Sequence, residues 1–317
     1  MVKKLLLSCV AILLLLTGCS SSDKKQEKKT GRYLSFNVTH VDEDEKLMND
    51  VYRYNCDTKK VEKMAELEST SQYALATYSY ADDSVYYSDR AVAKHQDNLY
   101  RYDRKSKEHK QLTDSLYALN DIIPDDGKIY LAAIPSDSQN FVLHLYEYKD
   151  GKLTADVPDD DYNVWNMSLN PKNGQLLLGG YSQAKEEEIT EKNNESDSIL
   201  DTLDPPSSTI YLRKGTSWTK KVDTASGRID SLCFTDNENI LYTQNSHLYE
   251  NGSSETSSLD NYNDLKIASL IYKEGGDLYY ADDHGINLYH AETKKTERIF
   301  HIDDDKSNVG NVYMLRK

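Results

Sequence analysis

The tetrapeptide Leu99-Tyr100-Arg101-Tyr102 decides the fold, because variants of it return along the whole chain. The variants are Val51-Tyr52-Arg53-Tyr54, Leu145-Tyr146-Glu147-Tyr148, Ile210-Tyr211-Leu212, Leu248-Tyr249-Glu250 and Leu288-Tyr289-His290. Their first tyrosines are 48, 46, 65, 38 and 40 residues apart. Tyrosine alternating with aliphatic and polar residues favours half-buried strands, so the chain contains six copies of one strand-based unit.

Further strands surround each copy of the motif. A second apolar stretch precedes it, as at Val85-Tyr86-Tyr87 and Leu278-Tyr279-Tyr280, and most of these stretches follow a turn rich in Asp, Asn and Gly. An outer stretch follows the motif, as at 109–112 and 297–300. The unit is therefore predicted to be a four-stranded antiparallel meander. Such units, repeated about every 40 to 50 residues, predict an all-β propeller over residues 33–317.

One turn of the repeat has a recognisable form. The run Pro124-Asp125-Asp126-Gly127-Lys128, followed by the Leu-Tyr-x-Tyr motif, resembles the repeats of TolB-type and peptidase-associated propellers. In those families a proline-and-aspartate turn leads into an inner strand. The resemblance covers nearly all of residues 33–317. It implies a fold and carries no catalytic residue with it.

The two ends of the repeat region complement each other. The first unit lacks an innermost strand, whereas the chain ends in a spare one, Asn311-Val312-Tyr313-Met314-Leu315. Because an unpaired edge strand is a liability that ring closure removes, we expect the last strand to complete the first blade. This predicts six four-stranded blades. A separate partial blade at the end, which would give seven, is the alternative.

The N-terminus has the pattern of an exported lipoprotein. Two lysines precede an apolar run at 5–16, which is too short for a permanent membrane span. The run ends in Leu16-Thr17-Gly18-Cys19, which resembles the lipobox of bacterial lipoproteins. We therefore expect a signal peptide at 1–18 and a lipid on Cys19, with acyl chains such as palmitate holding the protein at the outside of a cell membrane. An ordinary secretory signal is the alternative.

The segment that follows Cys19 and the overall charge limit what the protein can bind. Residues 20–31 are polar throughout, so 19–32 is predicted to be a disordered tether. Removal of the signal peptide would take the formal charge from −15 to about −17. A surface this acidic repels nucleic acid, so we expect the protein to bind none. We also expect it to be a monomer.

Cys56 and Cys233 are the two cysteines outside the signal peptide and the lipobox. Two cysteines in an exported chain usually suggest a disulfide. Here Cys56 falls on blade 1 and Cys233 on blade 5, and these blades are not neighbours in a ring of six. Because bridged cysteines need Cα atoms within about 7 Å, two free thiols are predicted.

No motif for catalysis is recognisable. The eight histidines lack zinc-protease spacing, and the sequence has no Gly-x-Ser-x-Gly elbow, phosphate loop or Cys-x-x-Cys pair. We therefore predict no catalytic residue, no metal site and no cofactor. A structural calcium ion in the ring axis is the alternative, although no segment has the ligand spacing of a known calcium loop.

Propeller topology places acidic loops together. The loops from second to third strands, and from each fourth strand to the next blade, lie on one face, which we name the loop face; the hairpin turns form the opposite turn face. The candidate binding residues on the loop face are Asp42, Asp44, Asp159, Asp160, Asp161, Asp282 and Asp283. Lysines such as Lys59, Lys60, Lys294 and Lys295 lie on the turn face, although Asp82, Asp83, Asp125 and Asp126 lie there too.

The loop face also carries an insertion at 182–208 in blade 4, which explains the spacing of 65 residues. Residues 185–204 hold eight acidic and two basic side chains. This composition predicts a solvated, disordered loop. The alternative is that the acidic rim recruits a cation or a basic partner.

Two functional hypotheses follow. The first is a membrane-anchored binding or scaffold lipoprotein outside the cytoplasm that presents a propeller face to an envelope protein, peptide or glycan. The second is a hydrolase or lyase that acts on envelope peptides or sugars from the central funnel, with residues scattered over several blades. A deep axial pocket with converging His, Asp or Arg side chains would favour the second.

Overall fold

The structure is a computed structural model that describes residues 31–91, 96–195, 203–224, 227–252, 256–259, 262, 264–302 and 307–317. The expected signal peptide, Cys19 and all but the last two residues of the expected tether lie outside these residues. Residues 31–317 form one compact unit. No helix among the described residues is long and apolar enough to cross a membrane.

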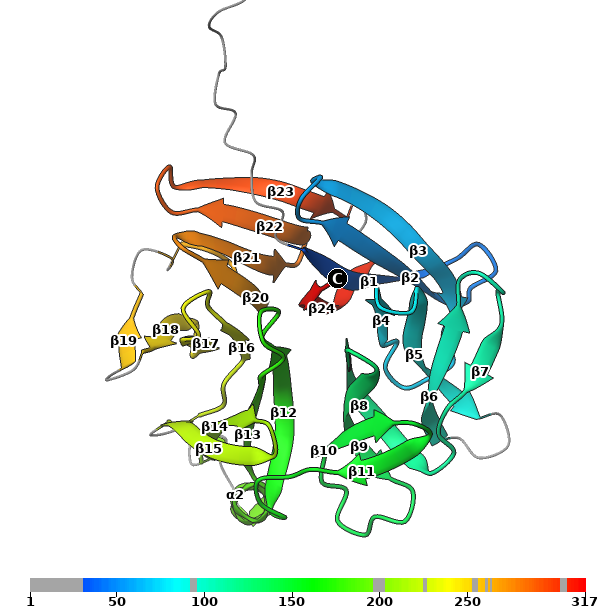
Figure 1. Cartoon of the computed structure of the whole chain (residues 1–317). Helices are drawn as coiled ribbons and strands as arrows, with labels where there is room; N and C mark the ends of the chain where they lie inside the picture. The colour runs from blue at the N-terminus through cyan, green and yellow to red at the C-terminus, as the bar shows by residue number, and fades with distance from the viewer. Residues whose placement is uncertain are drawn as a thin grey trace, which may run out of the picture. The chain divides into compact units, whose positions relative to one another are not determined.

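Six four-stranded antiparallel sheets are arranged around a centre (Figure 1). From the innermost strand outward, blade 1 is β24 (Asn308–Arg316), β1 (Arg32–Val41), β2 (Leu47–Asn55) and β3 (Lys60–Glu68). Blade 2 is β4 (Ala76–Ser79), β5 (Ser84–Ala91), β6 (Gln96–Asp103) and β7 (His109–Gln111). Blade 3 is β8 (Leu116–Asp125), β9 (Lys128–Pro135), β10 (His144–Lys149) and β11 (Lys152–Ala155).

The second half of the chain repeats the same order. Blade 4 is β12 (Tyr162–Leu169), β13 (Leu176–Ser182), β14 (Ser208–Lys214) and β15 (Ser217–Asp223). Blade 5 is β16 (Ser231–Phe234), β17 (Ile240–Gln244), β18 (His247–Asn251) and β19 (Thr256–Ser258). Blade 6 is β20 (Ser269–Glu274), β21 (Asp277–Asp282), β22 (Gly285–His290) and β23 (Lys295–His301). The prediction of a six-bladed propeller is confirmed.

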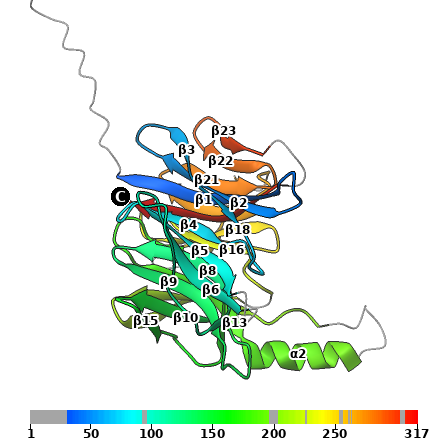
Figure 2. The ribbon, with the colours of Figure 1, turned by 90° about the vertical axis from the view of Figure 1, so that its right-hand side faces the viewer.

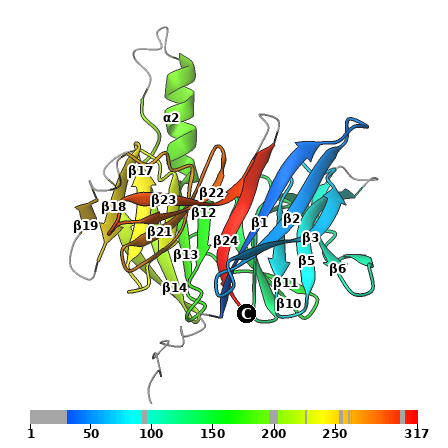
Figure 3. The same cartoon turned by 90° about the horizontal axis from the view of Figure 1, so that it is seen from above.

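The last strand closes the ring, as the sequence predicted. Strand β24 pairs antiparallel with β1, from Arg32 opposite Arg316 to Thr39 opposite Asn308. The backbone N–H of Lys317 donates to the carbonyl oxygen of Gly31 at 2.7 Å. The chain therefore enters and leaves the propeller on the turn face, and Figure 3 shows the C-terminus at the end opposite helix α2.

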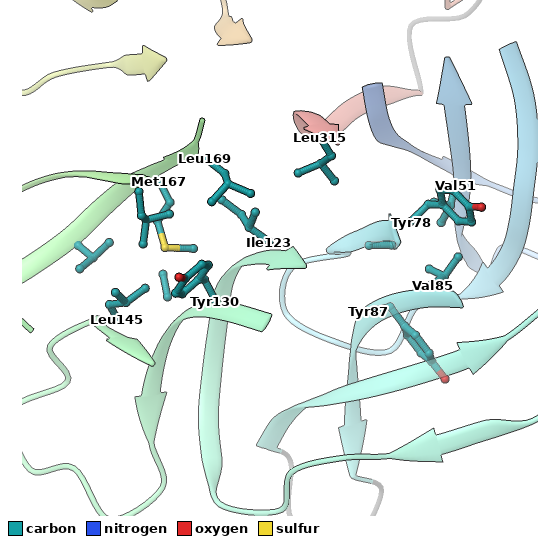
Figure 4. Close-up of a cluster of buried hydrophobic side chains, with 14 of the residues drawn as sticks. Val51, Tyr78, Val85, Tyr87, Ile123, Tyr130, Leu145, Met167, Leu169 and Leu315 are labelled. Carbon is teal, nitrogen blue, oxygen red and sulfur yellow. The ribbon is translucent and has the colours of Figure 1, made fainter. Parts of the chain in front are cut away.

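Burial decreases from the axis outward, which explains the composition of the strands. Inner strands such as β8 and β12 are mostly buried, whereas the outermost strand β7 is exposed throughout. A strand covered on both faces must be apolar along its whole length, and an edge strand can be polar. Side chains from neighbouring blades pack together: in Figure 4, Val51 of blade 1 lies beside Tyr78 and Val85 of blade 2, and Ile123 of blade 3 lies near Met167 of blade 4.

Arginines on the turn face tie blades together. Arg213 of blade 4 donates to the hydroxyl of Tyr130 at 2.8 Å and forms ion pairs with Glu147 and Asp156, all of blade 3. Arg32 of blade 1 bonds Glu274 of blade 6 at 2.6 Å. These charges are partly buried, where an ion pair is screened less than on an open surface.

The expectation of disorder in the insertion was wrong for residues 183–195. These residues form helix α2 (Gln183–Glu195), which projects from the propeller in Figure 2. The segment is rich in strong helix formers, and Glu188 pairs with Lys192 one turn on. The Ser182 hydroxyl accepts the N–H of Lys185 at 3.2 Å and so caps the first turn.

Both cysteines outside the N-terminal segment are free thiols, as predicted. Cys233 is buried in blade 5 between strands of the core, and Cys56 lies next to Met314, with 3.7 Å between the sulfur atoms. Burial raises the pKa of the Cys56 thiol to about 12. A thiol that does not ionise near neutral pH is a poor nucleophile, so both cysteines serve packing.

Candidate functional site

The predicted loop-face carboxylates lie in separate loops. Asp42 and Asp44 lie between β1 and β2, Asp159 to Asp161 between β11 and β12, and Asp282 and Asp283 at the junction of β21 and β22. Two of these loops belong to the neighbouring blades 1 and 6, and the third joins blade 3 to blade 4. No group of three or more His, Cys, Asp or Glu side chains that could hold a metal ion occurs in the described part of the chain.

Several of these carboxylates shape their own loops. The Oδ1 atom of Asp42 accepts the N–H of Asp44 at 2.9 Å and the N–H of Lys46 at 2.8 Å. Asp161 accepts the N–H of Ala184 at 2.8 Å and the hydroxyl of Ser182. Asp161 therefore caps helix α2 from a neighbouring loop, where a negative charge is favourable.

Among the predicted loop-face carboxylates, Asp282 is the one that forms an ion pair within the described part of the chain. Arg298 donates to its two oxygens at 2.7 and 3.2 Å, and the N–H of His284 donates at 2.9 Å. Burial opposes ionisation of this carboxyl, but the hydrogen bonds outweigh it and lower the pKa of Asp282. Asp282 thus stabilises the β21–β22 turn.

Exposed apolar side chains gather on the same face. Eight large hydrophobic side chains are exposed among the described residues: Val41, Leu47, Tyr73, Tyr80, Tyr117, Phe141, Trp165 and Leu203. Six of them lie in loops of the loop face or at strand ends that lead to it, Trp165 lies within β12, and Tyr80 lies on the turn face. Tyr117 and Phe141 contact each other edge to face, with ring centres 5.3 Å apart. The loop face therefore combines exposed aromatic rings with uncompensated negative charge.

A small cluster joins helix α2 to this face. The Arg228 guanidinium lies 5.1 Å from the ring centre of Trp165 and 4.7 Å from that of Tyr181. It also forms an ion pair with Glu186 of α2. No residue of the helix is buried, so this cluster and the N-terminal caps hold the helix. A helix of this length is marginal without such contacts.

A cavity of about 220 Å³ lies in the ring axis. Inner strands of five blades line it: β8, β12, β16, β20 and β24. The exposed residues Trp165 and Gly310 belong to its wall, which places them at its mouth. The surface exposed to the cavity is mostly polar, and the lining residues include several asparagines and serines.

The cavity lies where the inner strands are irregular. Four of its five strands have a shift in pairing register at this level: β8 at Asn120, β12 at Trp165, β20 at Ile271 and β24 near Gly310. A β-bulge re-aims side chains and interrupts regular packing. The bulges are why adjacent residues such as Asn120 and Asp121 both line the cavity.

Asp121 is the only residue with a formal charge among those that line the cavity. Its Oδ1 atom accepts the N–H of Ile122 at 3.0 Å and the side-chain amide of Asn311 at 3.1 Å. Burial raises the pKa of Asp121 to about 7, and the two hydrogen bonds only partly oppose this shift. The carboxyl is therefore about half ionised near neutral pH.

The sequence prediction included the loop carboxylates but missed Asp121 and Asn311. The sequence does contain one indication of these residues: the polar pair Asn120-Asp121 interrupts the apolar run from Leu116 to Ile123. Such residues are unusual in a strand buried on both faces. Their convergence depends on bulges, which no local motif indicates.

Comparisons with known proteins identify the architecture. No protein family matches the sequence, and no curated protein does. Among solved structures, a chain from the crystal structure of a nidogen/laminin complex is similar with a TM-score of 0.58 and 13% identity, over 89% of this chain and 98% of that one. TolB from Acinetobacter baumannii is similar with a TM-score of 0.54 and 11% identity, over 97% and 70%. The chain thus shares the propeller fold with TolB.

Proposed function

We propose that this protein is a lipid-anchored binding or scaffold protein outside the cytoplasm, and that its loop face docks a partner in the cell envelope. The observation that supports this most strongly is the distribution of exposed apolar side chains, six of which belong to loops or strand ends of the loop face and one to the turn face, while Trp165 lies within β12. Exposed aromatic groups that cluster on one face are typical of interaction sites.

Charge defines the chemistry of the partner. The loop face carries Asp42, Asp44, Asp159 to Asp161 and Asp283, which form no ion pair among the described residues. It also carries the glutamates of α2, of which Glu186 and Glu188 are paired with Arg228 and Lys192. Complementary potentials accelerate association and select partners. We therefore propose a protein or peptide that carries basic side chains next to an apolar patch, and we favour it over a glycan because a glycan gains less from negative charge.

The path of the chain fits an anchor on Cys19. The described chain begins at Gly31 on the turn face, where its carbonyl bonds Lys317. A tether attached there leaves the loop face free to meet a partner. Lysines of the hairpin turns, among them Lys59, Lys105 and Lys294, lie on the tethered side, where anionic lipid would attract them.

The axial cavity gives less support to an enzyme. The enzyme hypothesis expected converging His, Asp or Arg side chains in a deep axial pocket, and the lining residues of this cavity include one carboxyl and neither histidine nor arginine. General acid–base catalysis by a pair of groups would have to use Tyr313, the one other titratable residue among those that line the cavity, beside Asp121. Binding is therefore the function that we propose.

Site-specific photocrosslinking in the native membrane tests the docking face. A photoreactive benzoylphenylalanine replaces Phe141 or Tyr117, and the matched control replaces Tyr80, which is exposed to 43% on the turn face while Phe141 is exposed to 56%. We expect one discrete adduct from the loop-face positions and none from position 80. Equal labelling from both faces would reject the proposal.

The anchor has its own test. Cys19→Ser should move the protein from the membrane fraction to the soluble fraction and abolish incorporation of labelled palmitate. A variant that stays in the membrane fraction would show that Cys19 is not the anchor, whatever the crosslinking result.

A further inference from the structure

We propose that the axial cavity is a binding site for one primary ammonium group, with the Asp121 carboxylate as its counter-ion. The ammonium group is that of a lysine side chain or of a small free amine. The site lies in the ring axis, and its exposed lining residues are Trp165, which also belongs to the exposed apolar side chains described above, and Gly310.

The first argument is an uncompensated carboxylate. The Oδ1 atom of Asp121 accepts two hydrogen bonds, and among the described residues no donor bonds its Oδ2 atom. No lysine, arginine or histidine lines the cavity. A carboxylate in such a place is costly unless a cation pairs with it. The cavity therefore has a negative potential and no resident cation in its wall.

The second argument is a neighbouring acceptor without a donor. Asn311 donates its amide to Asp121 at 3.1 Å and to the hydroxyl of Tyr313 at 3.2 Å. Its Oδ1 atom is buried and has no hydrogen-bond partner among the described residues. An ammonium group has three donors and no acceptor. It can supply hydrogen bonds to both Asp121 and Asn311, which the fold leaves incomplete.

The third argument is size and shape. The cavity volume of about 220 Å³ is far above the roughly 10–15 Å³ that one water molecule needs, and below the roughly 300 Å³ at which pockets for drug-sized ligands begin. One side chain fits this volume. The surface that the cavity exposes is mostly polar, which suits a small charged group.

The donor set argues against a metal ion. Calcium takes six to eight oxygen ligands and usually several carboxylates, and the lining residues offer one. Zinc prefers nitrogen and sulfur ligands, and neither histidine nor cysteine lines the cavity. A monovalent organic cation matches a single carboxylate surrounded by amides and hydroxyls. A compact ammonium also needs fewer acceptors than the five-donor guanidinium group of arginine.

Calorimetric titration of the full chain in uncharged micelles tests the site with n-butylammonium, and n-butanol is the uncharged control. We expect saturable binding of one butylammonium and none of butanol. Asp121→Asn should weaken binding at least tenfold. Asp126→Asn, which removes an exposed carboxylate in the turn that follows the same strand, should change it less than twofold.

Proton release provides a second measurement on the unmodified protein. The titratable residues that line the cavity are Asp121 from β8 and Tyr313 from β24, and β12, β16 and β20 contribute none. Because the ammonium group selects ionised Asp121, binding near pH 7 should release about half a proton, falling toward zero near pH 9. Titrations in buffers of different ionisation enthalpy measure this release.

Three outcomes would overturn the proposal: unchanged affinity in Asp121→Asn, an equal loss in Asp126→Asn, or saturation by calcium chloride with no binding of butylammonium. The peptide acetyl-Gly-Gly-Lys-Gly-Gly-amide then distinguishes the two sources of the ammonium. If it binds at least as tightly as butylammonium, the source is a lysine side chain of a polypeptide; if it binds tenfold more weakly, the site takes small free amines.

This assay contains no partner protein. Its failure would reject the ammonium site and leave the docking proposal standing, whereas failure of the crosslinking experiment would do the reverse.

Discussion

The two faces of the propeller use aspartate in different ways. On the turn face, Asp83 pairs with Arg104 and Asp125 with Arg316, and the latter pair joins blade 3 to blade 1. On the loop face, most of the candidate carboxylates bond backbone N–H groups of their own loops or face solvent, and Asp282 is the one with an arginine partner in the described part of the chain.

This difference indicates that the aspartates of the turn face stabilise the fold, whereas most of those on the loop face contribute little to its stability and can serve binding. Charges that bridge blades resist separation of the sheets, and their loss affects the whole fold. Charges held in single loops shape only those loops, so the loop face can change its sequence at little cost to the ring. Loops on a rigid scaffold are the usual place for binding residues.

The largest effect is expected from Arg213, which serves three partners in blade 3. Arg213→Leu should lower the free energy of unfolding by about 3 kcal/mol, because Glu147 and Asp156 would remain partly buried without their cation. Urea denaturation measures this. Asp160→Asn on the loop face should change the same quantity by less than about 0.5 kcal/mol. Equal losses would erase the distinction between the faces.

Asp121 lies in the axial cavity and belongs to neither face. Its contribution to the free energy of unfolding should change with pH in the opposite sense to that of a paired aspartate. Its pKa is about 7 in the folded chain and about 3.9 in an unfolded one. Between these values the folded state binds more protons, so stability falls as the pH rises.

Asp121→Asn should therefore be more stable than the natural protein near pH 8, by on the order of 1 kcal/mol after allowance for water in the cavity, and should lose this advantage near pH 4. Urea denaturation at both pH values measures the difference. An advantage that does not depend on pH would show that the carboxyl is not the titrating group.

Asp161 tests whether a loop-face carboxylate acts locally. Asp161→Ala removes the cap of the Ala184 N–H and should cost α2 about 1 kcal/mol, which amide hydrogen exchange over residues 183–195 would detect. Strands of the core should keep their protection. Asp160→Ala is the control and should leave exchange of the helix unchanged.

The smallest effect is expected from Asp282, the exception on its face. The pKa of Asp282 is lowered in the folded state. Asp282 therefore stabilises the fold at pH values above the usual pKa of aspartate, and this stabilisation is lost as the pH falls through the pKa of the folded state. Asp282→Asn should cost about 0.5 kcal/mol at pH 7, since Arg298 is partly exposed, and the difference from the natural protein should shrink toward pH 3. Thermal melts across this range follow the change.

The fold could be predicted because each blade repeats the same pattern of strands and turns, and that pattern is visible in the sequence. Motifs such as Leu99-Tyr100-Arg101-Tyr102 mark the third strand, and the spare strand at 311–315 indicated closure. Helix α2 could not be predicted with the same reasoning. It buries no residue and has no apolar stripe, so its sequence resembles that of a solvated acidic loop.

The candidate site was predicted only in part. Topology places the loops of Asp42, Asp159 and Asp283 on one face, and that inference needs strand order alone. Asp121 and Asn311 are 190 residues apart and meet through ring closure. Their contact depends on bulges in separate strands, which are decided by packing between blades and not by the residues on either side.

The pairing of β1 with both β2 and β24 also determines how the protein would carry a mechanical load. If the tether is anchored and the loop face is bound, tension enters the propeller at Gly31 and runs along the axis of β1. The hydrogen bonds to both neighbouring strands then bear the load in shear and must fail together, whereas an edge strand would peel away one bond at a time. The strand that closes the ring therefore also makes its attachment point resistant to pulling.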